Sequence, residues 1–260
     1  MLSSLQSEKK RRELNEKLIK YTLILAAAIS ILTTFGILFS ILFEAIEFFQ
    51  LRSFWYFLTG TIWSPGVANS QFGALPIFAG TFVITIIALL VAIPIGLGSA
   101  IYMSEYASPK FRDYLKPILE ILAGIPTVVY GFFAAITVAP LVVKVAAFFG
   151  LEATFNSALA SGIVMGIMII PLISSLSDDV IRAVPDSQRK AAFALGMTHG
   201  ETIKNIVIPS AMPGIISASL LALSRALGET MIVVMAAGLR PNLSWNPLED
   251  MTTVTVTIVN

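Results

Sequence analysis

The 260-residue chain has no cysteine, a single histidine (His199) and few charged residues, which make up 13% of the total. The lack of cysteine excludes disulfides, thiolate metal sites and cysteine nucleophiles, and one histidine cannot build a multi-histidine metal centre. A soluble domain carries roughly 25% charged residues. The low charge, the 56% of hydrophobic residues and a mean hydropathy of +0.84 therefore indicate an integral membrane protein.

Motifs that carry chemistry are equally scarce. No G-x-x-x-x-G-K-[ST] loop occurs in the sequence, so no Walker motif binds nucleotide on this chain. His199 is expected to be solvated in a loop, without the partners of a Ser-His-Asp triad. The carboxylate pairs Asp178-Asp179 and Glu249-Asp250 have too few polar neighbours to indicate a metal site. We therefore expect no cofactor, no metal and no catalytic residue.

Long apolar runs dominate the sequence instead, and a run of about 20 residues can span a bilayer as a helix. Five runs predict transmembrane helices: Tyr21–Phe43, Leu75–Met103, Ile118–Phe149, Asn156–Leu176 and Pro213–Gly238. The first follows the basic stretch KKRRELNEKLIK but is too long for a signal peptide, so we predict a retained helix. The ending MTTVTVTIVN predicts the start of a sixth span that continues beyond Asn260.

The lysine and arginine residues predict how the spans are oriented. With a cytoplasmic N-terminus, only Arg52 and Arg240 lie in outside segments, Lys144 and Arg225 lie within spans, and all other Lys and Arg residues lie inside. Cytoplasmic loops carry an excess of these residues, so this orientation is the predicted one. The segment Glu44–Ala74 then faces outward.

Helix-breaking residues punctuate three of the spans, at Pro94, Gly96, Gly98, Gly124, Pro126, Gly131 and Pro171. Interrupted helices in transporters often mark the substrate site. Glycine and proline are also commoner in membrane helices than in soluble ones, so both interpretations stay open for each residue.

The segment Ser177–Met212 is far longer than a connection between two helices requires. Pro185 is typical of a helix start, and Gly196 and Gly200 are typical of turns, so we predict a short helix, a glycine turn and a second short helix. Such an element suits docking into the groove of a partner. The alternative is a loop that lies on the lipid headgroups.

Spacing within this segment resembles the E-A-A-x3-G-x9-I-x-L-P loop of ABC importer permeases. The matching residues are Lys190, Ala191, Ala192, Gly196, Ile206 and Pro209. Lys190 stands where the family usually has Glu, and Ile208 where it usually has Leu. The resemblance implies an all-α membrane protein with the ABC type-1 importer permease fold, whose loop forms coupling helices that dock on an ATPase subunit.

Four further stretches narrow the resemblance to permeases of the phosphate-specific importers: GTFVITIIALLVAIPIGLGSAIYMSEYAS, AGIPTVVYGFF, IRAVPDSQRKAA and SRALGETM. Before the second span, SFWYFLTGTIWSP and QFGALPIFAGT resemble the PstC-type subunit rather than its PstA-type partner. The resemblance implies a bacterial or archaeal plasma-membrane (inner-membrane) permease that forms half of a pathway for inorganic phosphate. Its implied partners are a PstA-type permease, separate ATPase subunits, an extracytoplasmic phosphate-binding protein and membrane lipid.

Two regions are expected on this basis. Residues 1–72 would hold a basic cytoplasmic tail, the first transmembrane helix and an extracytoplasmic loop. Residues 73–260 would hold the permease core, incomplete at its C-terminus, with five clear transmembrane helices in the chain and the start of a sixth.

Arg225 and Glu229 are the charged residues of the fifth predicted span, and the resemblance assigns phosphate passage to them. Arg225 would lie about 18–20 Å along the helix axis from either end. A charge at that depth costs at least about 2.5–3.5 kcal/mol on insertion scales, so it needs a partner or water. Glu229, one turn on, predicts either a structural i,i+4 ion pair or a competitor that keeps an anion from binding Arg225 too tightly.

Other functions remain open from the sequence. A guanidinium suits sulfate or molybdate as well as phosphate, so another oxyanion is possible. A secondary transporter could use Arg225 and Glu229 as substrate and proton sites, but it would not need an ATPase-docking loop. A membrane enzyme would need a richer polar cluster.

Overall fold

The computed structural model describes residues 2–66 and 70–260, with side chains from residue 15 onward. It divides into two compact units, Met1–Phe57 and Leu58–Asn260, which are described separately. The basic side chains Lys9, Lys10, Arg11 and Arg12, used above for orientation, lie outside the described side chains.

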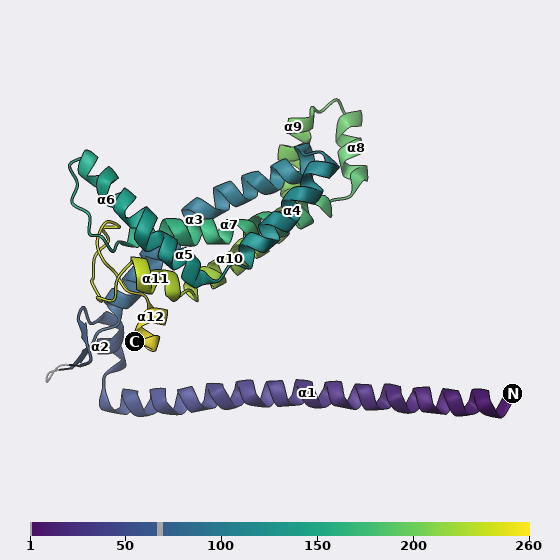
Figure 1. Cartoon of the computed structure of the whole chain (residues 1–260), viewed down its shortest axis with the longest axis horizontal. Coiled ribbons are helices and arrows are strands. Elements are labelled where there is room, and N and C mark those ends of the chain that lie inside the picture. The colour runs from purple at the N-terminus through teal and green to yellow at the C-terminus, as the bar shows by residue number, and fades with distance from the viewer. Residues whose placement is uncertain (1, 67–69) are drawn as a thin grey trace. The chain divides into compact units, whose positions relative to one another are not determined.

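The first unit consists mainly of helix α1 (Leu2–Leu51), a single uninterrupted helix (Figure 1). Its apolar part, Asn15–Leu51, is long enough to cross a membrane and contains the predicted span Tyr21–Phe43. No residue of its most apolar window is buried within the chain, as expected for a helix whose side chains face lipid. The rings of Phe48, Phe49 and Phe57 pack edge to face at its end.

The second unit contains the elements that follow α2, whose residues Phe54 to Phe57 still belong to the first unit. After α2 (Phe54–Thr59) and the strands β1 (Trp63–Ser64) and β2 (Gln71–Phe72), the helices are α3 (Leu75–Ile101), η1 (Tyr102–Tyr106), α4 (Pro109–Ala123), α5 (Thr127–Phe133), η2 (Ala134–Val138), α6 (Ala139–Phe148), α7 (Ala158–Arg182), α8 (Asp186–Ala194), α9 (His199–Thr202), η3 (Ile203–Val207), α10 (Ile208–Leu227), α11 (Met231–Ala236) and α12 (Val254–Val259). The three η segments are π-helical turns that continue neighbouring α-helices. The strands form one antiparallel pair, with Trp63 opposite Phe72.

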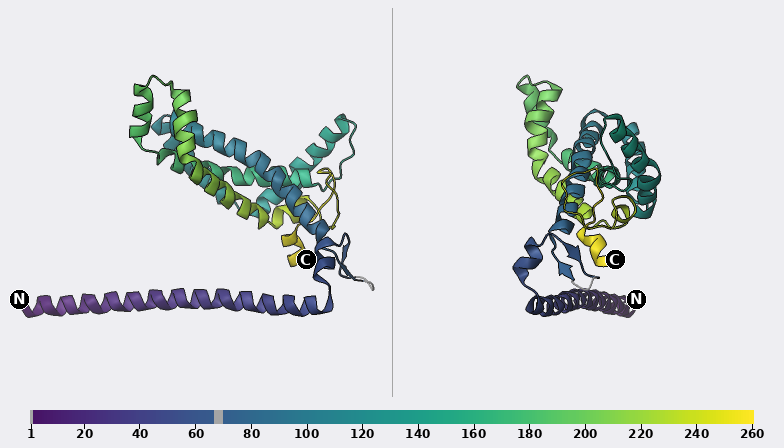
Figure 2. Two further views of the ribbon diagram at one scale, coloured as in Figure 1. Left: turned by 180° about the vertical axis from the view of Figure 1, so that it is seen from behind. Right: turned by 90° about the vertical axis from the view of Figure 1, so that its left-hand side faces the viewer.

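The core of this unit is the pair α3 and α7, which lie side by side (Figures 1 and 2). Glycine permits the close approach, because a Cβ at Gly162 would lie 2.7 Å from Ile87 and a Cβ at Gly96 would lie 2.9 Å from Ile173. The contact further along α3 is also the one further along α7, so the two helices run parallel. Small residues let membrane helices pack this closely.

Helix α10 also packs against α7, and small residues of α10 permit this contact. A Cβ at Gly214 would lie 2.3 Å from Val180, and Ala218 and Ala222 are buried. The face of α10 that carries Leu220 and Leu221 is exposed. An exposed apolar face of this kind is compatible with lipid or with another membrane subunit.

Five helices of the described residues are long and apolar enough to cross a membrane, which agrees with the predicted number. The second and fourth, Leu75–Tyr106 and Ala158–Arg182, lie close to their predicted bounds. Pro94 and Pro171 remain inside these helices and do not interrupt them, so for these two residues the structure supports the alternative that they are ordinary prolines of membrane helices.

The third predicted span, Ile118–Phe149, is not one helix. Helix α4 ends at Ala123, residues Gly124 to Pro126 are not helical, and the membrane-length helix runs from Thr127 to Phe148. Proline lacks an N–H group, and it biases the preceding residue, Ile125, away from helical geometry. Gly124 and Pro126 are therefore a real interruption, whereas Gly131 lies within α5.

The fifth predicted span, Pro213–Gly238, was misplaced. The observed helix runs from His199 to Leu227 and ends at Gly228, and α11 is a separate short helix. Residues 199–212, which were expected in a loop, therefore form the start of this helix. Near the end of the chain, Val254–Val259 form the short helix α12. That this segment starts a sixth span stays a prediction.

The segment before α12 is fixed against α3. Gly80 has no room for a Cβ, which would lie 2.2 Å from the carbonyl oxygen of Thr252. The backbone N–H of Val254 donates to Oγ1 of Thr81 at 3.0 Å. This contact brings α12 to the same end of the unit as α11 (Figure 1).

Candidate functional site

Arg225 lies in the last turn of α10, directly before the interruption at Gly228. Its side chain is exposed within the chain. Among the described residues it makes no hydrogen bond or ion pair, although its charge interacts electrostatically with Tyr130 of α5. A cation near a helix C-terminus is stabilised by the helix dipole. The helix end therefore supports a guanidinium that remains available to an anion.

Glu229 does not pair with Arg225, so the structure contradicts the alternative of a structural i,i+4 ion pair. The helix ends between them, and Glu229 is only 8% exposed. Its Oε1 accepts from the backbone N–H groups of Met231 at 3.1 Å and Ile232 at 3.4 Å. Its carbonyl oxygen accepts from Oγ1 of Thr255 at 2.9 Å. Glu229 thus holds the start of α11 and joins it to α12, because free N–H groups at a helix start need acceptors.

A second interruption, between α4 and α5, carries a residue that the sequence analysis did not single out. The hydroxyl of Tyr130 in α5 donates to the carbonyl oxygen of Leu122 in α4 at 2.9 Å. The bond spans the non-helical residues from Gly124 to Pro126. A tyrosine in an otherwise apolar run, close to G-I-P, was the available signal.

The segment between α7 and α10 folds largely as predicted. Helix α8 begins after Pro185, and the chain reverses at Gly196, whose φ of +83° favours glycine. Thr198 and Glu201 then form a capping box at the start of α9. Gly200 lies inside this helix, so the prediction of a turn there was wrong, and α9 continues through η3 into α10.

Residues of the coupling motif come together on one side of this segment. A groove of about 560 Å³ lies between α8 and the start of α10 and is lined by Gln188, Ala191, Ala192, Leu195, Met197, Asn205, Ile206, Pro209 and Ser210. Four of the six motif residues are in that lining. Gly196 makes the turn beside the groove, and Lys190 is exposed outside it. The spacing of the motif therefore corresponds to a continuous groove between α8 and the start of α10.

Buried charge fixes this segment to the membrane helices, and the sequence analysis missed it. Arg189 of α8 donates to Oε1 of Glu105 at 2.8 Å and to the carbonyl oxygen of Ile181 at 3.0 Å. His199 Nε2 lies 3.9 Å from Oε2 of the same Glu105, and its ring packs against Tyr106. The side chain of His199 is 45% exposed, so the expected solvation holds only in part.

A second ion pair joins α4 to α7. Arg112 Nη2 lies 2.6 Å from Oδ2 of Asp178, and Arg112 Nε donates to the same oxygen at 3.1 Å. The Asp178 side chain is 1% exposed. The hydrogen bond to Asp178 raises the pKa of Arg112 above its ordinary value. Lys116 pairs with the more exposed Asp179 on the same face. Charged groups that are this deeply buried are normally paired in this way.

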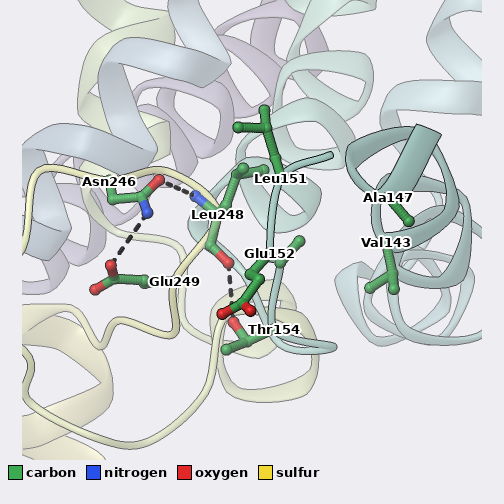
Figure 3. A pocket seen from close by; sticks show the side chains of 9 residues that line it. Val143, Ala147, Leu151, Glu152, Thr154, Asn246, Leu248 and Glu249 are labelled. Atoms are coloured by element: carbon green, nitrogen blue, oxygen red, sulfur yellow. Dashed lines mark hydrogen bonds between the residues drawn. The ribbon is translucent and has the colours of Figure 1, made fainter. Parts of the chain in front are cut away.

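A pocket of about 600 Å³ lies at the other end of the unit, between the end of α6 and the loop that precedes α12 (Figure 3). The carbonyl oxygen of Leu248 accepts from the backbone N–H and from Oγ1 of Thr154. Glu249 accepts from Asn246 and Asn242. Hydrogen bonds from Ser244 and these amides lower the pKa of Glu249. The pocket wall therefore carries an ionised carboxylate.

Comparisons with known proteins identify the family. Residues 92–253 match the family described as binding-protein-dependent transport system inner membrane component. The probable ABC transporter permease protein YqgH of Bacillus subtilis is 37% identical over 202 residues, which cover 78% of this chain and 64% of YqgH. The phosphate transport system permease protein PstC 1 of Mycobacterium tuberculosis is 34% identical over 79% of this chain and 70% of that protein.

Another relative agrees with this result. The PstC protein of Mesorhizobium japonicum is 34% identical over 90% of this chain and 76% of its own length. Among solved structures, the inward-facing MetNI methionine ABC transporter has a TM-score of 0.49 and 19% identity, covering 64% of this chain and 73% of that chain. The chain therefore belongs to the binding-protein-dependent transport system inner membrane components, the permeases of ABC importers, and is a multi-pass membrane protein.

Proposed function

We propose that this chain is the PstC-type permease subunit of an ATP-driven importer for inorganic phosphate and forms half of the translocation pathway. The PstC relatives are named as phosphate transport system permeases, and they align with most of this chain. The observation that carries the proposal is Arg225, an exposed guanidinium without a carboxylate partner among the described residues, at the interrupted end of a membrane helix. A guanidinium binds phosphate oxygens in a planar, bidentate manner.

Glu229 has a different part in this proposal from the one expected. Because its carboxylate is occupied by the N–H groups of α11, it supports the interruption that leaves Arg225 at a helix end. We assign it to the substrate pathway as a structural member. Transport requires that the anion leave again, and a single exposed arginine provides binding weak enough for release.

The groove between α8 and α10 is the surface that we assign to ATPase docking. Ala191, Ala192, Ile206 and Pro209 line it, Gly196 makes the adjacent turn, and Lys190 extends into solvent at its edge. A helix of the ATPase subunit fitted into this groove would push on α8. Arg189 would pass that force to Glu105 in η1, the turn that continues α3, since the two side chains are joined at 2.8 Å.

The partners and the setting follow from this assignment. We propose a PstA-type second permease, separate ATPase subunits that perform all ATP hydrolysis, an extracytoplasmic phosphate-binding protein and surrounding lipid. The chain would lie in a bacterial or archaeal plasma (inner) membrane with its N-terminus in the cytoplasm, as the lysine and arginine distribution favours. Residues 1–72 would provide the tail, first span and outer loop, and residues 73–260 the permease core.

The experiment is uptake of radiolabelled phosphate by the complete complex in proteoliposomes with ATP on the ATPase side. Phosphate uptake that depends on this chain and on ATP is the expected result. Sulfate and molybdate form the second arm, because a guanidinium suits these oxyanions as well. ATP-driven uptake of one of them without phosphate uptake would replace phosphate as the substrate, and uptake without any ATPase would indicate a secondary transporter.

A further inference from the structure

Two interrupted membrane helices meet near Arg225. Helix α5 begins after the interruption at Gly124 to Pro126, and α11 begins after the interruption at Gly228. The two short helices are in direct contact, because a Cβ at Gly131 would lie 2.6 Å from Sδ of Met235 and 3.3 Å from the carbonyl oxygen of Met231. Tyr130 precedes Gly131, so it lies at this junction.

The hydroxyl of Tyr130 is a hydrogen-bond donor that can change its acceptor at little cost. It has one proton, which it now donates to the carbonyl oxygen of Leu122. That carbonyl oxygen also accepts from the backbone N–H of Ile125 at 3.3 Å. If the hydroxyl turns away, the carbonyl oxygen of Leu122 therefore keeps a hydrogen-bond partner.

Arg225 and Tyr130 come from different helices but lie near the same junction, because Met231, six residues after Arg225, lies against Gly131, the neighbour of Tyr130. The charge of Arg225 also acts on the Tyr130 hydroxyl. Both side chains have accessible surface, and Arg225 has no competing carboxylate among the described residues. An oxyanion held by the guanidinium would have a further oxygen free to accept a hydroxyl proton. Phenolic hydroxyls donate short, strong hydrogen bonds to charged oxygens.

We propose that Tyr130 is a second phosphate-contacting residue of the pathway, whose hydroxyl moves from the carbonyl oxygen of Leu122 to an oxygen of the anion bound by Arg225. This inference rests on the proposed function. It also links substrate to conformation, because the bond that the hydroxyl leaves is the one that spans the α4–α5 interruption. The passing anion thereby loosens the connection between these helices.

The alternative for Tyr130 is a purely structural bond across the interruption. Tyr130→Phe removes the hydroxyl in both cases, so the single variant alone does not separate the two roles. A double-mutant cycle with Arg225→Lys does so, because residues that bind one ligand together are coupled, whereas a distant structural bond acts independently.

The cycle is measured as ATP-driven phosphate uptake by the complete complex in proteoliposomes, at matched amounts of assembled complex. Tyr130→Phe is expected to lower uptake at least about tenfold, as for loss of a hydrogen bond to a charged group. In the Arg225→Lys background the same change should lower uptake less than about threefold. Tyr114→Phe is the control, since Tyr114 is a 72% exposed tyrosine of α4, and it should leave uptake unchanged.

Three results would overturn the inference: unchanged uptake in Tyr130→Phe, an equal loss in both backgrounds, or failure of Tyr130→Phe to assemble. The last two would show that the hydroxyl only holds the interruption together. A failure of the proposed function is separable, because Arg225→Gln would then transport phosphate normally. A transport defect in Arg225→Gln with normal uptake in Tyr130→Phe would reject only the role of Tyr130.

Discussion

Replacing both Arg225 and Glu229 by glutamine tests whether the two charges form a self-neutralising pair. If they did, the double variant would recover what Arg225→Gln loses, since no uncompensated charge would remain. The structure predicts no recovery, because Arg225 is exposed at the end of α10 while Glu229 accepts from the N–H groups of Met231 and Ile232. The two side chains have separate tasks.

The size of each effect follows from these contacts. Arg225→Gln would remove a charged, bidentate contact to phosphate, and each hydrogen bond to a charged group contributes about 1.5–3 kcal/mol. Loss of about 3 kcal/mol corresponds to roughly 100-fold slower uptake. Glu229→Gln keeps an acceptor oxygen but loses its charge. It should therefore cost no more stability than the loss of a whole acceptor at a helix start, which is about 0.5–2 kcal/mol. The double variant should therefore be at least as impaired as Arg225→Gln.

The assay is ATP-driven phosphate uptake by the complete complex at matched membrane abundance. Arg240→Gln is the control, because Arg240 is an exposed arginine outside the membrane-length helices, and it should transport normally. Recovery of the double variant to near the wild-type rate would refute both the separate tasks and the contact of Arg225 with the anion.

Three further variants test other parts of the structure. Gly196→Asp should insert and assemble with normal abundance but lose ATP-driven uptake, because a non-glycine residue at φ +83° costs about 1–2 kcal/mol and moves the turn beside the docking groove; wild-type uptake would reject the groove as the docking surface. Arg112→Ala should destabilise the purified protein by about 3–5 kcal/mol because it leaves Asp178 buried and unpaired, whereas Lys116→Ala, at a more exposed pair, should cost less than about 1 kcal/mol; equal thermal stability of the two variants would contradict the buried pair. Gly80→Ala should lower thermal stability by about 1–3 kcal/mol because its Cβ meets the backbone of Thr252, while Gly98→Ala in the same helix has open space and should be neutral; a neutral Gly80→Ala would show that this segment does not contact α3.

Much of the molecule follows from local features of the sequence. Apolar runs identify five membrane helices because a bilayer requires about 20 apolar residues for each crossing. The turn at Gly196 is predictable because few residues other than glycine adopt positive φ. The motif from Lys190 to Pro209 predicts the segment that we propose for docking, because its spacing reflects the two short helices and the turn between them.

Other features depend on contacts between distant residues. Pro94 and Pro126 look alike in the sequence. Helix α3 nevertheless continues through Pro94 and packs along α7, whereas the helix is interrupted at Pro126. Hydropathy cannot separate the two cases, because neighbouring helices and side chains decide whether freed backbone groups find partners. The bond from Tyr130 to Leu122 is one such partner, and it became evident only in the folded chain.

Arg225 and Glu229 show the same division most clearly. The sequence alone determined that two opposite charges lie in an apolar run and that the run belongs to a membrane protein. Only the tertiary structure decided that the helix ends between them, because the acceptors for the first N–H groups of α11 come from Glu229 and the carbonyl of Glu229 is held by Thr255. Two side chains that are four residues apart lie on one face only if the helix is continuous between them. Contacts with the rest of the fold decide whether the helix is continuous.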